Sequence, residues 1–155
     1  MDSLSEKQID VLKFVHESQR AEFQGHRNSI LNVTTWWTTA LIAVMGAIIV
    51  LQPQFDPACP IAVVVVLGIV TLISILVVVF IFRQRWYAAE ALRIMIAIEM
   101  QLGLFEDDVY LSGKSVLPRN FVDPPQAKGW PTKSDWIQIG IIVVLTLLVW
   151  MAFVI

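Results

Sequence analysis

The sequence has little charge, and in three long stretches it has none. Only 15% of its 155 residues are charged and 57% are hydrophobic, a balance far from that of soluble globular domains. No ionisable side chain occurs in residues 30–51, 60–82 or 136–155. A helix that spans a bilayer needs about 20 predominantly apolar residues. We therefore predict an all-α integral membrane protein with three transmembrane helices at these positions and the lipid bilayer as its partner.

Chemically reactive side chains are also scarce. The single cysteine, Cys59, excludes a disulfide within the chain and a zinc site built from several thiolates. Neither His16 nor His26 falls in an uncharged stretch, so no histidine is available there to bind haem or relay protons. Glycine-rich phosphate-binding patterns, H-E-x-x-H and G-x-S-x-G are absent. We expect neither an enzyme nor a bound cofactor or metal, and no nucleic-acid partner.

Basic residues are missing from one side of the predicted topology. All eleven lysines and arginines either precede the first stretch or lie between the second and third, and the 52–59 loop contains none. Such residues concentrate on the cytoplasmic side of membrane proteins. We therefore expect a multi-pass protein of the cell inner (plasma) membrane with its N-terminus inside and its C-terminus outside. Residues 1–29 lack the pattern of a cleaved signal peptide, so we expect them to be retained.

The segments on the cytosolic side are predicted to extend the first two spans. Residues 1–29 contain no proline, and residues 83–105 continue without a helix breaker as far as Gly103. Both carry apolar residues at helical spacing. Together with the short outer loop at 52–59, this predicts a long cytosolic helical hairpin. Residues 106–135 hold four prolines and two glycines, so we expect an irregular segment that wraps over the hairpin or a neighbouring subunit.

Two ion pairs are predicted to fix the register of this hairpin. With the inner ends of the first two spans level, Arg27 falls opposite Glu90, and Arg20 falls opposite Glu99. Partly exposed pairs of this kind are worth about 0.2–1 kcal/mol each. We expect them to select the register of the two helices more than to supply stability.

The tryptophans are predicted to mark the boundaries of the membrane, because an indole ring favours the headgroup layer. Trp36 is expected to lie level with Arg83 at the inner boundary. Four further tryptophans are assigned to the same boundary and one to the outer boundary. The inner group comprises Trp36, Trp37, Trp86, Trp130 and Trp136, and the outer residue is Trp150.

Small and hydroxylated residues share one face of the first span, and the second span has a similar patch. Small residues allow close helix packing in lipid, whereas rings of neutral polar groups can line an ion path. Helix packing and pore lining both remain open here. The residues are Asn32, Thr35, Thr39, Ala43 and Gly46 on the first span, and Thr71 and Ser74 on the second.

Three arginines are expected just below the inner headgroups: Arg27, Arg83 and Arg85. Basic residues near the surface attract anionic lipid by about 1 kcal/mol each. The alternative is a pocket for an anionic ligand such as a nucleotide messenger.

The order of a cytosolic helix, two spans and a long helix after the second span carries a resemblance. The last of these helices contains R-x-R-W-Y…E…I-E-x-x-L-G-L-F over residues 83–105. This arrangement resembles the small two-span effector modules associated with bacterial nucleotide-signalling and anti-phage systems. The resemblance covers about residues 1–105 and implies a membrane pore. The third span departs from that pattern, and no site residue is carried over.

Uncharged spans limit what the chain can do. Coupled transporters and proton pumps place ionisable groups near the membrane midplane, and three helices are too few to enclose a path alone. We therefore predict a homo-oligomeric pore or ion channel. The alternative is a non-conducting accessory or scaffold subunit that binds a cytosolic protein partner through the hairpin. An axis lined by Asn32, Thr35 and Thr39 would favour the pore.

Overall fold

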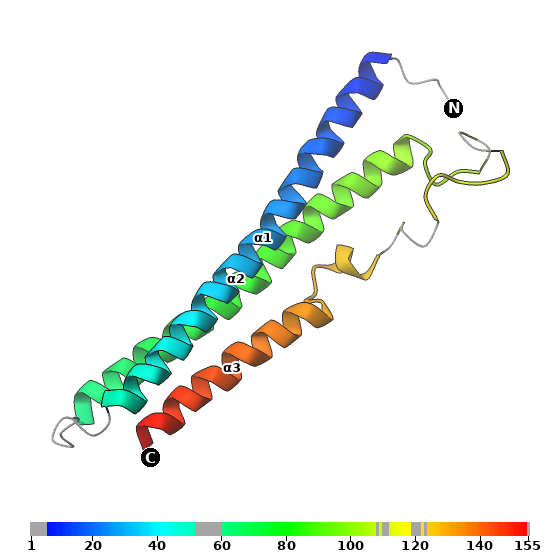
Figure 1. Cartoon of the computed structure of the whole chain (residues 1–155). Coiled ribbons are helices and arrows are strands. Elements are labelled where there is room, and N and C mark those ends of the chain that lie inside the picture. Colours follow the sequence, from blue (N-terminus) through cyan, green and yellow to red (C-terminus); the bar gives the residue numbers. More distant parts are fainter. Residues whose placement is uncertain are drawn as a thin grey trace. The chain divides into compact units, whose positions relative to one another are not determined.

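The computed structural model describes residues 6–51, 60–107, 109, 112–118, 122 and 124–154. These contain three long α-helices and one short 3-10 helix (Figure 1): α1 (Glu6–Leu51), α2 (Pro60–Gln101), η3 (Pro125–Lys128) and α3 (Lys133–Val154). No strand occurs in these ranges, so the all-α prediction is confirmed for the described part of the chain. The 52–59 loop, with Cys59, lies outside it.

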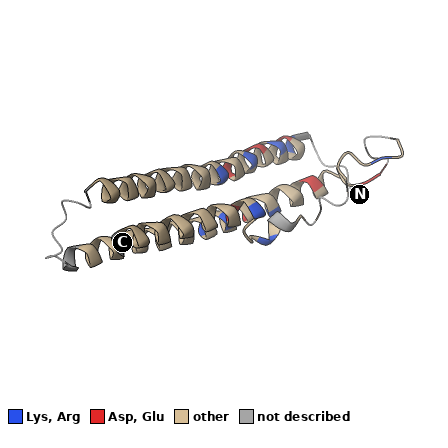
Figure 2. Ribbon diagram, turned by 60° about the horizontal axis from the view of Figure 1, so that its bottom comes forward, with Lys and Arg blue, Asp and Glu red and all other residues tan. Residues whose placement is uncertain are grey.

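All three long helices include a segment that is long and apolar enough to cross a membrane. These segments carry no Lys, Arg, Asp or Glu over many consecutive turns (Figure 2). The charged residues of α1 and α2 fall in the other part of each helix, before residue 30 and after residue 82.

The chain divides into two compact units, each with its own packing. Unit 1 comprises Met1–Asn28 and Gln84–Trp130, and unit 2 comprises Ser29–Arg83 and Pro131–Ile155. Both α1 and α2 therefore contribute one segment to each unit. The helix α3 belongs to unit 2, and η3 belongs to unit 1.

In unit 2 the segments of α1, α2 and α3 lie side by side (Figure 1) and bury an aliphatic core. On α1 the buried residues Ile30, Leu41 and Ile48 repeat on one side of the helix, as expected for a helix with a single core face. The core has two clusters. One contains Ile30, Val77, Ile81, Ile139 and Ile142; the other contains Leu41, Ile48, Leu67, Val70 and Val149.

Thr132 and Asp135 cap the start of α3. The carboxylate of Asp135 accepts hydrogen bonds from the backbone N–H of Thr132 at 2.6 Å and from its hydroxyl at 2.7 Å. This pairing satisfies a donor that the first turn of a helix leaves without an intrahelical partner. The helix consequently begins at Lys133, three residues before the predicted start of the span.

The end of α2 is set by Gly103. Its φ of 70° is a left-handed conformation that glycine adopts without strain. The N–H of Gly103 donates to the carbonyl of Met100 at 3.0 Å, and the N–H of Leu104 donates to that of Glu99 at 3.1 Å. These two bonds define a Schellman motif, which closes a helix and turns the chain away. The helix ends at Gln101, slightly before the predicted limit of residue 105.

In unit 1 the proline-rich segment lies on α2 of the same chain. Ile96 on α2 and Phe105 just after it form a buried cluster with Ala127, against which Leu117 and Val122 pack. Close approach to the helix is possible at Gly129, where an added Cβ would lie 3.6 Å from both the Ala89 and Trp86 side chains. Its φ of 74° also disfavours any other residue.

Candidate functional site

Unit 2 turns its most polar surface away from its own core. On α1 the side opposite Ile30, Leu41 and Ile48 carries five of the residues that the sequence singled out, and each of them is exposed. They are Asn32, Thr35, Thr39, Ala43 and Gly46. We call this surface the α1 polar face.

The outward surfaces of α2 and α3 differ from the α1 polar face in chemistry. Their exposed side chains within the uncharged stretches are aliphatic or aromatic, including Val65, Ile69, Leu72, Leu76, Ile141, Val144, Leu147 and Met151. Such surfaces suit contact with acyl chains, whereas amide and hydroxyl groups do not. Unit 2 is therefore chemically two-sided.

Hydrogen bonding on the α1 polar face is incomplete within the described chain. The hydroxyl of Thr39 donates to the carbonyl of Thr35 at 2.9 Å, within its own helix. The side-chain amide of Asn32 has no partner among the described residues. An amide offers two donors and one acceptor oxygen, so this position requires water or another protein group rather than hydrocarbon.

Other polar groups of unit 2 are bonded to each other in its interior. The indole N–H of Trp37 donates to the Ser74 hydroxyl at 3.1 Å, and the hydroxyls of Ser74 and Thr146 lie 2.8 Å apart. One short chain of hydrogen bonds thus connects α1, α2 and α3. Ser74 and Thr146 are both buried, so the chain is shielded inside the unit.

Two further contacts reinforce the same packing. The indole N–H of Trp150 donates to the hydroxyl of Thr71 at 3.0 Å, and the hydroxyl of Thr34 donates to Gln138 at 3.3 Å. Thr71 and Ser74 therefore both take part in hydrogen bonds between helices of this unit.

The position of the tryptophans differs from the sequence-based expectation. Trp37 meets Ser74, which precedes Arg83 by nine residues, or roughly 13 Å along a helix. Trp36, which immediately precedes Trp37 on α1, therefore does not lie level with Arg83. The Trp37 indole serves the bundle interior, whereas Trp36 is 77% exposed. Trp86, Trp130 and Trp136 are exposed as well.

In unit 1 the two predicted ion pairs are replaced by other contacts. Glu99 pairs with His16 at 2.9 Å rather than with Arg20. Because His16 lies one turn before Arg20 on the same side of α1, the two helices are displaced by about one turn from the predicted register. Glu90 pairs at 3.3 Å with Arg93 of its own helix rather than with Arg27.

The second histidine joins α1 to α2 further along unit 1. The Nδ1 atom of His26 lies 2.6 Å from Oε1 of Gln84, and its ring stacks on Tyr87 with centroids 5.7 Å apart. Its Nε2 atom lies 3.8 Å from Glu22. No group of three histidine, cysteine, aspartate or glutamate side chains suitable for a metal is found within the described ranges.

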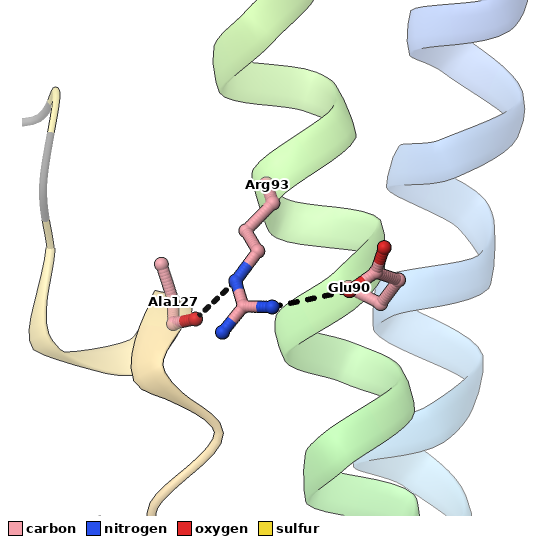
Figure 3. A network of polar contacts seen from close by, with 3 residues as sticks. All are labelled: Glu90, Arg93 and Ala127. Carbon is pink, nitrogen blue, oxygen red and sulfur yellow. Dashed lines mark hydrogen bonds and ion pairs between the residues drawn. The ribbon is translucent and has the colours of Figure 1, made fainter.

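Arg93 fixes the irregular segment onto α2 (Figure 3). Its Nε donates to the carbonyl of Ala127 at 2.8 Å, and one terminal nitrogen donates to Glu90 at 3.3 Å. Arg93 and Glu90 are both about half exposed. The ion pair between Arg93 and Glu90 therefore contributes only modestly to stability. The hydrogen bond to Ala127 gives Arg93 a structural role.

The three arginines expected at the inner boundary have different surroundings. In unit 1, Arg85 is only 7% exposed, whereas Arg27 is exposed and lies 5.9 Å above the ring of Phe23. Arg83 belongs to unit 2 and is exposed. Of the three, Arg85 is therefore the buried one, and Arg27 and Arg83 lie at the surfaces of their units.

Comparison with models of protein families, with characterised proteins and with solved structures found no match for this chain. The functional argument below therefore depends on the geometry and chemistry of the α1 polar face, the α2 and α3 surfaces, and the contacts of unit 1.

Proposed function

We propose that the chain spans a membrane three times and assembles into a homo-oligomeric pore whose axis faces the α1 polar face. The observation that carries this proposal is the two-sided chemistry of unit 2. The exposed side chains of α2 and α3 in the uncharged stretches are all apolar, whereas α1 exposes amide, hydroxyl and small groups together with apolar ones such as Trp36 and Val50. Hydrocarbon cannot satisfy the Asn32 amide, whereas a second copy or a water-filled path can.

Self-association of identical chains most often gives closed symmetric assemblies. In such a ring every copy would present the same face of α1 to the axis. Asn32, Thr35 and Thr39 would then supply neutral oxygen and amide groups along the path. Ala43 and Gly46 would keep that path free of bulky side chains. Neutral polar groups of this kind can replace part of the hydration shell of an ion.

Two further observations support a pore. The uncharged stretches offer no ionisable group for coupled transport or proton pumping. The sequence over residues 1–105 also resembles small two-span effector modules that are regarded as membrane pores. The third span is absent from that pattern, so the resemblance bears on α1 and α2 only.

Conductance in planar bilayers tests this proposal. The purified protein is expected to produce discrete current steps. In a Cys59→Ser background, a charged water-soluble thiol reagent should reduce the current of the Thr39→Cys variant at least severalfold. The matched control is Val144→Cys on the outward surface of α3, whose current should not change. Absence of current from the native chain, or equal inhibition of both variants, would contradict the proposal.

The proposed location is a bacterial inner membrane, with unit 1 in the cytoplasm. This orientation is supported by the position of all eleven basic residues on one side of the three spans. Tags at the two termini, probed with a protease in sealed inside-out vesicles, test it. We expect cleavage of the N-terminal tag and protection of the C-terminal tag. Cleavage of both tags would rule out an odd number of spans.

A non-conducting scaffold remains the second candidate because unit 1 exposes large apolar side chains. Phe14 is 73% exposed and Val11 is 55% exposed, on neighbouring turns of one side of α1. Clustered exposed apolar residues often mark a protein-binding surface. A Phe14→Ser variant should then lose a cytosolic partner that co-purifies with the native chain, in a protein that gives no current.

A further inference from the structure

Unit 2 has a cavity of about 340 Å³ between α2 and α3. Exposed aliphatic side chains form its mouth, namely Ile75, Val79, Val143 and Leu147. At its floor lie Ser74 and Thr146. The hydroxyls of these two residues bond to each other at 2.8 Å, and each also lies within bonding distance of a carbonyl of its own helix. The cavity therefore offers almost no free hydrogen-bonding group to a ligand.

An aromatic pair lies about one helical turn from the cavity, on the side where Arg83 follows in α2 and where α3 begins. Phe82 on α2 and Trp136 on α3 meet edge to face, with ring centroids 6.1 Å apart. Arg83 follows Val79 by four residues, which places it one turn away on the same side of α2. Along this surface, apolar walls are followed by aromatic rings and then by a cation. This order matches a phospholipid, whose acyl chain is apolar and whose phosphate is negatively charged.

We propose that this cavity binds one acyl chain of an anionic phospholipid, with the lipid phosphate beside Arg83. The proposal rests on the membrane-spanning part of the proposed function and does not depend on conduction. It assigns the outward surfaces of α2 and α3 to lipid and leaves the α1 polar face to the axis of the proposed pore.

The size of the cavity favours an acyl chain over a helix of a second copy. Ligand pockets generally measure about 300–1,000 Å³, and this cavity falls at the lower end of that range. A helix with its side chains is about 10–12 Å in diameter and would require a far longer and wider groove. A flexible hydrocarbon chain can enter between the two helices without displacing the Ser74–Thr146 contact.

Photolabelling of the full chain in lipid vesicles tests the cavity. The probe is phosphatidylglycerol with a photoactivatable group in one acyl chain, and labelled residues are identified by mass spectrometry. Val143 and Val144 are neighbours on α3 with similar exposure, 48% and 55%, but only Val143 lines the cavity. We expect labelling at the cavity in the native chain and in Val144→Trp, and at least a fivefold loss in Val143→Trp.

Equal labelling of the two tryptophan variants would overturn the lipid site, as would crosslinks between two copies at Val143. To test the headgroup contact, Arg83→Gln is compared with the native chain, using probes with phosphatidylglycerol or phosphatidylcholine headgroups. We expect the preference for phosphatidylglycerol to disappear in the variant, and an unchanged preference would overturn the placement of the phosphate. Extraction of the protein from vesicles by alkaline carbonate would instead refute membrane insertion, which separates the two failures.

Discussion

At the scale of single residues, neighbouring side chains of identical chemistry have opposite environments. Thr34 is buried and bonded to Gln138, whereas Thr35 is exposed on the α1 polar face. The sequence could indicate that threonines concentrate at this end of the span. It could not show which of them face the core, because that depends on the rotation of α1 against α2 and α3. Gln138 was missed for the same reason.

Ser74 forms hydrogen bonds with two other helices, through Trp37 on α1 and Thr146 on α3. We predict that it contributes measurably to stability. Hydrogen bonds between membrane helices average about 0.6 kcal/mol and reach about 1.7 kcal/mol. Ser74→Ala removes contacts with Trp37 and Thr146, so the free energy of unfolding should fall by about 1–2 kcal/mol. Thermodynamic unfolding in mixed detergent micelles measures this change. Ser18→Ala, at an exposed position of unit 1, is the control and should have little effect.

A double-mutant cycle separates this bond from general packing. Thr146→Val removes the partner hydroxyl with little change of shape, and the double variant combines both changes. Because the two side chains share one hydrogen bond, the effects should not add. Strict additivity of the two changes in unfolding free energy would contradict the contact between Ser74 and Thr146.

At the scale of helices, the sequence was informative about extent and less so about register. Uncharged runs indicated the three segments, and Gly103 indicated the end of α2. The pair Thr132 and Asp135 has the spacing of a capping box, a signal that was present but was not used to start α3. The register was predicted by setting Trp36 level with Arg83, and the two ion pairs followed from that alignment. In the structure, His16 and Glu99 meet instead.

Chemical crosslinking can distinguish the two registers of unit 1. In a Cys59→Ser background, a short bifunctional thiol reagent should crosslink the pair His16→Cys and Glu99→Cys within one chain. The pair Arg20→Cys and Glu99→Cys, one turn away on α1, should react at least severalfold less. Mass spectrometry of the monomer band measures both. Preferential crosslinking of the second pair would restore the register expected from the ion pairs.

At the scale of the whole molecule, α3 is a structural part of unit 2 rather than an appendage. It supplies Gln138, Thr146 and Trp150 to hydrogen bonds with the other two helices, and Ile142 and Val149 to the two core clusters. The resemblance to two-span modules did not include this helix. Its packing against α2 covers one side of that helix, and the α1 polar face remains exposed.

The central claim is that three helices lie in lipid while the α1 polar face avoids it. Spin labels at single cysteines in a Cys59→Ser background, with the protein in lipid vesicles, test this claim directly. Collisions with oxygen report lipid, and collisions with a water-soluble nickel complex report water. We predict high oxygen accessibility at Leu72 and Val144, and low oxygen accessibility at Thr39 with either nickel accessibility or none. Oxygen accessibility at Thr39 equal to that at Leu72 and Val144 would contradict the claim.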